Sequence, residues 1–351
     1  MGVLHEIRTT DYHTAGEPFR IVTSELPAIP GATVRDRRES ARNDAEVDLV
    51  RRLLCHEPRG HADMYGCFLV PPDDGGAHLG ALFWHKDGFS TACGHGTIAL
   101  GAWAVESGRV PAPPDGDTEV VIDVPSGRVT ARVSRRAGLV DRVTFRNVAS
   151  YVLAREVTVR TTRGPVRVDL GYGGAIYASL PAASVGLAVT PEHYPELIAV
   201  GREVKRVLDG TQIARHPTDP RLSGVYGTIL YEDLGTVPAG GAGPAGGAGA
   251  GSRHQRSVTI FADGEVDRSP CGSGTCARLA LLVAEGSLGD GEELTHDSII
   301  GTRFLARVAG QTTVDGRPAV VPEVEGSAYR TGEHTFLLDE RDPLGTGFVL
   351  R

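Results

Sequence analysis

Hydrophobic and polar positions alternate along much of this chain with the two-residue period typical of half-buried β-strands. The alternation is clearest where valines and polar residues take turns, over 118–124, 127–134, 140–146, 150–161 and 165–170. Shorter stretches predict further strands at 3–9, 19–24, 66–70, 80–85, 257–262, 298–308, 319–324 and 335–339. The 3.6-residue period of an amphipathic helix is present over 39–55 and 191–209. We therefore expect many short strands and few helices.

Two segments far apart in the chain interrupt this pattern with the same motif. Cys93 opens CGHGTIALGAWAVESG (93–108), and Cys271 opens CGSGTCARLALLVAEG (271–286). Both read C-G-x-G-T-x-A, followed by apolar residues and a glycine at the same offset. Glycine permits a tight turn, and alanine and leucine favour a helix. The motif predicts a cysteine at each helix N-terminus, where free backbone N–H groups favour a thiolate. Two copies indicate a duplicated module.

The chain is long enough, at 351 residues, for two domains. The mixture of strands and helices predicts the α+β class, each half wrapping a curved, mostly antiparallel sheet around its own helix. We expect a first domain at 1–150 carrying Cys93 and a second at 151–334 carrying Cys271. The segment 235–252, GTVPAGGAGPAGGAGAGS, is predicted to be a flexible insertion in the second domain, with an interdomain linker as the alternative.

Composition excludes several classes of function. A formal net charge of −8 argues against general affinity for nucleic acid or anionic membranes. No apolar run approaches membrane-spanning length and no signal segment is evident, so a cytoplasmic location is expected. The only lysines, Lys86 and Lys205, lie outside any glycine-rich phosphate cradle, which argues against a pyridoxal-phosphate enzyme. With no nucleotide-binding glycine motif either, no cofactor is expected.

The remaining cysteines have an ordinary explanation. Cys55, Cys67 and Cys276 occupy apolar contexts without C-x-x-C spacing, and they are expected to be buried hydrophobic residues.

A thiolate can take a proton from carbon while a thiol returns one to the opposite face, which inverts a stereocentre without a cofactor. Backbone N–H groups at the helix starts would stabilise charge developing on a substrate carboxylate. The natural donors are Gly94, His95, Gly272 and Ser273. Asp267 precedes Cys271 by four residues and is placed to hold an ammonium or imino group, with a local turn cap as the alternative.

Other interpretations of these residues remain open at this point. His95 is a donor to the substrate or a neighbour of the thiol, or it only caps the helix. A metal site is not expected, because His13, His56 and His61 form no compact ligand pattern with Cys93. A redox protein that cycles through a disulfide, or a binding protein without catalysis, is an alternative class.

These segments resemble those of the proline racemase family, which includes hydroxyproline 2-epimerases and trans-3-hydroxy-L-proline dehydratases. The resemblance lies in TACGHGTIALG (91–101) and DRSPCGSGTCARLAL (267–281), and also in DYHTAGEP (11–18), EPRGHADMYG (57–66), GYGGAIYA (171–178) and RDPLGTGFVL (341–350). It covers nearly the whole chain apart from the glycine-rich segment.

The resemblance implies a diaminopimelate-epimerase-like fold of two similar domains with the active site between them. It also implies that the C-terminal strand, at about 335–351, returns to the first domain. By motif, Cys93 and Cys271 are the acid and base, and Asp267 holds the ring nitrogen. The resemblance further assigns Gly94, His95, Gly272 and Ser273 to the carboxylate, and Tyr65 and Phe261 to the walls around the ring.

The choice between reactions depends on a few positions. In mammalian-type dehydratases of the family a threonine replaces the second cysteine, since elimination needs one proton-abstracting face. The presence of Cys271 therefore favours inversion, whereas EPRGHADMYG, GGAHLG (75–80) and the tail favour the dehydratase branch. Ser273 replaces the more usual threonine and keeps its hydroxyl. We predict a racemase or epimerase of proline or a hydroxyproline, as a homodimer, with the dehydratase as the alternative.

Overall fold

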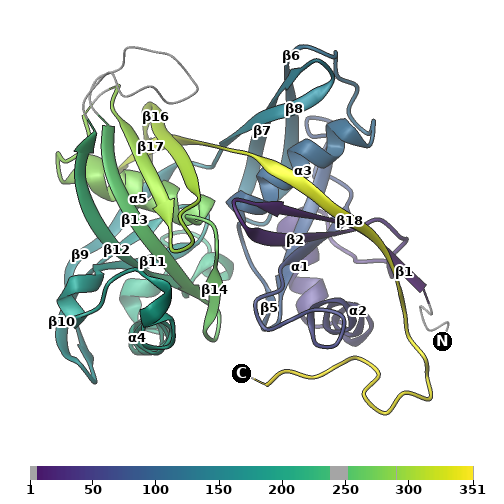
Figure 1. The fold of residues 1–351 in the computed structure, drawn as a ribbon, viewed down its shortest axis with the longest axis horizontal. Helices are drawn as coiled ribbons and strands as arrows, with labels where there is room; N and C mark the ends of the chain where they lie inside the picture. Colours follow the sequence, from purple (N-terminus) through teal and green to yellow (C-terminus); the bar gives the residue numbers. More distant parts are fainter. Residues whose placement is uncertain (1–5, 238–251, 290, 351) are drawn as a thin grey trace. The chain divides into compact units, whose positions relative to one another are not determined.

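The computed structural model describes residues 6–237, 252–289 and 291–350, which form two compact units (Figure 1). Unit 1 comprises the described chain up to Val143 and again from Ser327, and unit 2 comprises Thr144–Gly326. These boundaries precede the expected 150 and 334. Arg146 already forms an ion pair with Glu323 inside unit 2, and the returning strand pairs from residue 328 onward.

Unit 1 contains one run of strands and three helices. The strands are β1 (Glu6–Thr14), β2 (Glu17–Val22), β3 (Gly66–Val70), β4 (Leu79–His85), β5 (Gly88–Phe89), β6 (Gly116–Val124), β7 (Gly127–Arg136), β8 (Leu139–Arg146, which crosses the boundary) and β18 (Ala328–Leu337). The helices are α1 (Val34–Arg42), α2 (Ala45–Cys55) and α3 (Gly94–Glu106).

The sheet of unit 1 runs in the order β18, β1, β2, β3, β4, β6, β7. Helix α3 packs against β1, β2, β7 and β18, whereas α1 and α2 contact β4. Nearly every side chain of α3 is buried, because the helix is apolar on all sides. The last strand of the unit, β18, pairs antiparallel with β1 along the whole length of β1 (Figure 1).

Unit 2 has a similar inventory. Its strands are β9 (Ser150–Thr161), β10 (Gly164–Tyr172), β11 (Ile176–Pro181), β12 (Val225–Val237), β13 (Ser252–Phe261), β14 (Glu265–Asp267), β15 (Glu293–Ser298), β16 (Arg303–Val314) and β17 (Arg317–Gly326). The α-helices are α4 (Tyr194–Leu208) and α5 (Gly272–Ala284), with short 3₁₀ turns at Ala182–Val185, Pro191–His193, Gln212–Ala214 and Pro220–Leu222.

The strands of unit 2 form a closed ring of pairings. The order is β9, β10, β11, β12, β13, β15, β16, β17, and β17 pairs again with β9. Helix α5 contacts β9, β10, β16 and β17, so the ring encloses it. The amphipathic α4 instead packs its apolar face, including Leu197, Val200 and Val204, on β12 and β13.

The two units repeat the same order of pairings. In unit 1 the pairs along β1, β2, β3, β4, β6, β7 are antiparallel, parallel, antiparallel, parallel and antiparallel. The same series runs along β10, β11, β12, β13, β15, β16. In each unit a short strand, β5 or β14, precedes the cysteine and its buried helix. This repetition is what a duplicated module predicts, and the α+β class is confirmed.

Several predicted elements differ in detail from the structure. The helix expected at 39–55 is two helices, because Asp44 caps α2 by accepting from the N–H groups of Glu46 and Val47. The strand expected at 298–308 is split by a turn, in which Ser298 N–H donates to Thr302 O.

The ends of the segment predicted to be a flexible insertion are strand. Residues 235–237 belong to β12 and residue 252 to β13, while 238–251 lie outside the described residues. Cys55, Cys67 and Cys276 are buried free thiols, as expected. Among the described helices, none combines the length and apolar character needed to span a membrane.

Candidate active site

Cys93 immediately precedes α3 and caps it. Its backbone is extended, with φ −155°, and its sulfur accepts a hydrogen bond from Gly96 N–H at 3.2 Å. The first-turn N–H groups of Gly94 and His95 have no partners within the helix, as at any helix start. The residue is 5% exposed, so the sulfur is largely desolvated.

His95 is the polar neighbour of this sulfur. Both ring nitrogens lie 3.5 Å from Cys93 Sγ. Burial lowers the pKa of His95 to about 3, so the imidazole is neutral at physiological pH. His95 was expected to be a donor to the substrate, a neighbour of the thiol or a helix cap, and the structure shows it as a neighbour of the thiol. A neutral imidazole can donate to or accept from sulfur, depending on its tautomer.

Aromatic rings pack around His95. Tyr65 meets the imidazole edge-on with ring centroids 5.0 Å apart, and Phe19 does so at 5.7 Å. The Tyr65 hydroxyl lies 2.5 Å from Ser90 Oγ, and both residues are buried. Tyr65 therefore belongs to the same cluster as Cys93, with its hydroxyl group bonded to Ser90.

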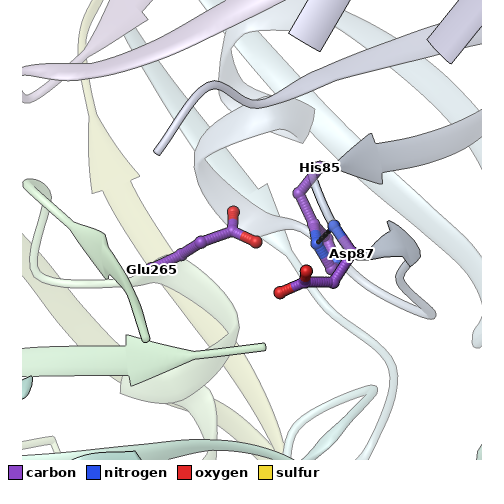
Figure 2. A group of neighbouring side chains, drawn as sticks. All are labelled: His85, Asp87 and Glu265. Carbon is purple, nitrogen blue, oxygen red and sulfur yellow. Dashed lines mark hydrogen bonds between the residues drawn. The ribbon is translucent and has the colours of Figure 1, made fainter. Parts of the chain in front are cut away.

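The turn between β4 and β5 adds an imidazole beside Tyr65. The rings of His85 and Tyr65 lie 5.7 Å apart, and burial lowers the pKa of His85 to about 3. His85 Nδ1 accepts from Asp87 N–H at 3.2 Å (Figure 2). The third side chain in Figure 2, Glu265, begins β14 of unit 2. Within either unit taken by itself, no three ligand atoms of described His, Cys, Asp or Glu residues lie within 4.8 Å of one another, as a metal site would require.

Cys271 precedes α5 but has a different backbone. Its φ of +65° is in the left-handed region, which a residue with a Cβ rarely adopts. Burial and the nearby Asp267 charge raise the pKa of the Cys271 thiol well above its usual range, and interactions with Gly274, Thr259 and Tyr177 lower it by less. At Cys271, desolvation of the sulfur opposes the stabilisation of a thiolate that a helix start provides.

Asp267 is held by the turn before Cys271. Its Oδ1 accepts from Ser269 N–H at 2.8 Å and from Ser269 Oγ at 2.7 Å, and Ser269 Oγ in turn accepts from Cys271 N–H at 3.0 Å. Burial raises the pKa of Asp267 to about 6. A buried carboxylate gains stability from a cationic partner, which suits it to a ring nitrogen.

Aromatic rings also line the neighbourhood of Cys271. The Tyr177 hydroxyl lies 3.9 Å from the sulfur, Tyr226 packs edge-on against Tyr177, and Phe261 stacks on Tyr226 at 5.6 Å. Phe261 is thus linked to the cysteine through two tyrosines. Ser273 is fully buried in the first turn of α5, next to Gly272.

Glycine is required at the third position after each cysteine. A Cβ on Gly96 would approach Cys93 Sγ to 2.8 Å and Phe19 to 2.4 Å. A Cβ on Gly274 would approach Cys271 Sγ to 2.9 Å. The missing side chain lets each sulfur rest against the first turn of its helix.

Sequence reasoning missed several residues that contact the predicted ones: Phe19, Ser90, Tyr177, Tyr226, Thr259 and Ser269. Only two of these residues lie in a sequence segment that already pointed to the site. Tyr177 lies in GYGGAIYA and Ser269 in DRSPC, both of which carried the family resemblance.

Comparison with known proteins decides the family. The family model described as proline racemase matches residues 9–349. The chain belongs to the proline racemase family. Among curated members, it is 43% identical over 352 residues to a trans-3-hydroxy-L-proline dehydratase of Burkholderia cenocepacia, covering all of both chains. It is 42% identical to a 3-hydroxyproline 2-epimerase of Burkholderia multivorans, again over the full length of both.

A solved member of the family has the same fold. A hydroxyproline epimerase from Agrobacterium vitis, with bound trans-4-hydroxy-L-proline, superposes with a TM-score of 0.88 at 32% identity. The match covers 99% of this chain and 96% of that one. The family contains both isomerases and hydro-lyases, so membership makes this chain an enzyme of one of these classes.

Proposed function

We propose that the protein is a cofactor-independent epimerase acting at Cα of a hydroxyproline, with Cys93 and Cys271 as the proton-transferring groups. One cysteine takes the proton from Cα and the other delivers a proton to the opposite face. The observation that carries the proposal is the repeated placement of a buried cysteine directly before a buried helix, Cys93 before α3 and Cys271 before α5.

The electrostatics of unit 2 support a role for each partner. The raised pKa of Cys271 makes this residue the proton carrier in the substrate-free enzyme. Asp267 is proposed to hold the positively charged ring nitrogen, which offsets the cost of burying the carboxylate. The mechanism needs no cofactor, because two thiols supply both proton transfers.

The substrate carboxylate would be held by the helix starts. Gly94, His95, Gly272 and Ser273 occupy the first turns, where backbone N–H groups favour an anion. Charge accumulates on the carboxylate oxygens when the α-proton leaves, so these donors bind the transition state more tightly than the substrate. Tyr65 and Phe261 are proposed to pack against the ring.

Dehydration of trans-3-hydroxy-L-proline is the second candidate. It is favoured by the 43% identity to the trans-3-hydroxy-L-proline dehydratase of Burkholderia cenocepacia. Both reactions begin with removal of the α-proton, so one site can support either.

Incubation in heavy water tests the proposal. L-proline, trans-4-hydroxy-L-proline and trans-3-hydroxy-L-proline are supplied separately, and the products are followed by NMR and chiral chromatography. Deuterium at Cα with inverted configuration supports epimerisation. A cyclic imine that a reductase converts to proline indicates dehydration. Absence of Cα exchange with all three substrates would contradict the proposed function.

A further inference from the structure

A hydrogen-bonded hydroxyl pair lies in the same cluster as Cys93. The Tyr65 hydroxyl and Ser90 Oγ are 2.5 Å apart. Tyr65 is 2% exposed and Ser90 is 3% exposed. The Tyr65 ring contacts the imidazole of His95, which touches Cys93 Sγ. The phenol, imidazole and thiol are thus neighbours inside one unit.

The surroundings of the pair orient its protons. Ser90 Oγ donates to Ala92 O at 3.4 Å, which leaves its lone pairs for the Tyr65 hydroxyl, and Ser90 N–H is bound to Phe83 O. Either hydroxyl can donate in the short hydrogen bond, and Tyr65 is the donor when Ser90 Oγ donates to Ala92 O. The Ser90 hydroxyl therefore orients the phenol proton by accepting a hydrogen bond from it.

A buried positive charge lies near the phenol. Arg38 is 8% exposed and donates to Phe89 O through Nε at 3.0 Å and Nη2 at 2.8 Å. Its charge interacts with Tyr65, and Phe89 directly precedes Ser90 in the chain. A guanidinium stabilises the negative charge that a tyrosine acquires when it gives up its proton, and low solvent exposure strengthens that interaction.

The stereochemistry of trans-3-hydroxy-L-proline indicates a role for the Tyr65 and Ser90 hydroxyls. In trans-3-hydroxy-L-proline the 3-hydroxyl and the carboxylate lie on opposite faces of the ring. The α-hydrogen therefore lies on the same face as the 3-hydroxyl. A base that takes this hydrogen and an acid that protonates the leaving hydroxyl must both act from that face, and unit 1 holds a thiol and a phenol in one cluster.

We propose that Tyr65, supported by Ser90, is the general acid that protonates the leaving 3-hydroxyl, an inference that rests on the proposed function. The Cys93 thiolate takes the α-proton, and the electron pair of the Cα–H bond forms a Cα=C3 double bond. The C3–O bond breaks, and the oxygen takes the Tyr65 proton and leaves as water. Proton exchange with solvent then restores the thiolate and the phenol. The enamine product tautomerises to the cyclic imine.

The test compares two reactions of one enzyme. Only substrates with a 3-hydroxyl use the phenol proton, so Tyr65→Phe should lower the ratio of dehydration of trans-3-hydroxy-L-proline to Cα deuterium exchange of L-proline about 100-fold. Ser90→Ala should lower the same ratio about tenfold, and Ser90→Thr should restore it, since it keeps the hydroxyl. Tyr151→Phe is the matched control, because it removes a hydroxyl bonded to His216 in the core of unit 2.

The outcomes separate the two proposals. An unchanged ratio in Tyr65→Phe, or an equal loss of both reactions in a variant with wild-type melting temperature, overturns the acid role. If Tyr65→Phe does not fold, an unchanged ratio in Ser90→Ala overturns it instead. Failure of the wild-type enzyme to exchange Cα or to dehydrate ends both proposals, whereas exchange without dehydration ends only this one.

Discussion

The two units share one strand order and each places a cysteine before a buried helix, yet they hold their sulfurs differently. Cys93 has an extended backbone and a neutral imidazole beside it. Cys271 has a left-handed backbone, for which strain of order 1 kcal/mol is typical, and it lies near a carboxylate and a phenol. The duplicated motif therefore preserves the helix start but not the electrostatic environment of the thiol.

This difference bears on the direction of proton flow. The imidazole beside Cys93 carries no charge, whereas burial and the neighbouring Asp267 charge favour the protonated form of Cys271. Two copies of one module have thus become chemically distinct. The predictions below separate the contributions of the two sites.

Replacing either cysteine by alanine should produce the largest loss of activity. Cys93→Ala is expected to lower inversion and dehydration about 10³-fold, because it removes the base proposed for both reactions. Cys271→Ala should lower inversion to the same extent but dehydration less than about tenfold, since elimination uses one face. Chiral chromatography and imine formation measure the two rates. Equal losses of dehydration in the two variants would contradict the division of roles.

Asp267→Asn should weaken substrate binding while stabilising the folded protein. The KM for a hydroxyproline is expected to rise about 100-fold, because a buried charged partner of the ring nitrogen is lost. The asparagine keeps an oxygen that can accept from Ser269.

The same variant should be more stable than the wild type at alkaline pH. Burial raises the pKa of Asp267 from its ordinary value of 3.8 to about 6 in the folded chain, so the folded state binds the proton more tightly. Wild-type stability therefore falls as the pH rises between these values, and the cost persists above pH 6. The melting-temperature advantage of Asp267→Asn should be largest at pH 8 and vanish near pH 4. A variant that melts lower than the wild type at pH 8 would contradict this account.

Alanine at the two glycines should distinguish the sulfur pockets. Gly96→Ala is expected to destabilise the fold by about 2 kcal/mol, because its Cβ meets both a Phe19 ring carbon and the sulfur. Gly274→Ala meets the sulfur at 2.9 Å and Ile229 at 3.1 Å, so it should cost less. Urea unfolding followed by circular dichroism measures both. The reverse order of stability would show that the pocket of Cys271 is the tighter one.

Tyr177→Phe is expected to have the smallest effect. Its hydroxyl helps to lower the pKa of Cys271, and loss of one such hydrogen bond is worth about 1 kcal/mol, or about fivefold in the rate of inversion. Alkylation of Cys271 by iodoacetamide, measured in a Cys93→Ala background, should slow as well. Faster alkylation would show that Tyr177 shields the sulfur instead of stabilising its thiolate.

Elements with strong local signals were predicted well. The strands expected at 66–70 and 150–161 are β3 and β9 with the same ends, and both cysteines begin helices. Alternation and helix-starting glycines are local properties, so a sequence displays them directly. The break at Asp44 was missed because a cap inside a continuous helical pattern resembles an ordinary polar position.

The family and the placement of Cys93 and Cys271 at helix starts were determined by the sequence alone, since each rests on a contiguous motif. Only the tertiary structure decided what surrounds each thiol. The partners Tyr177 and Cys271 are 94 positions apart in the chain, and Tyr65 and Ser90 are 25 apart. The left-handed backbone of Cys271 and its raised pKa have the same origin, because strain and burial depend on packing between distant segments, which no local pattern encodes.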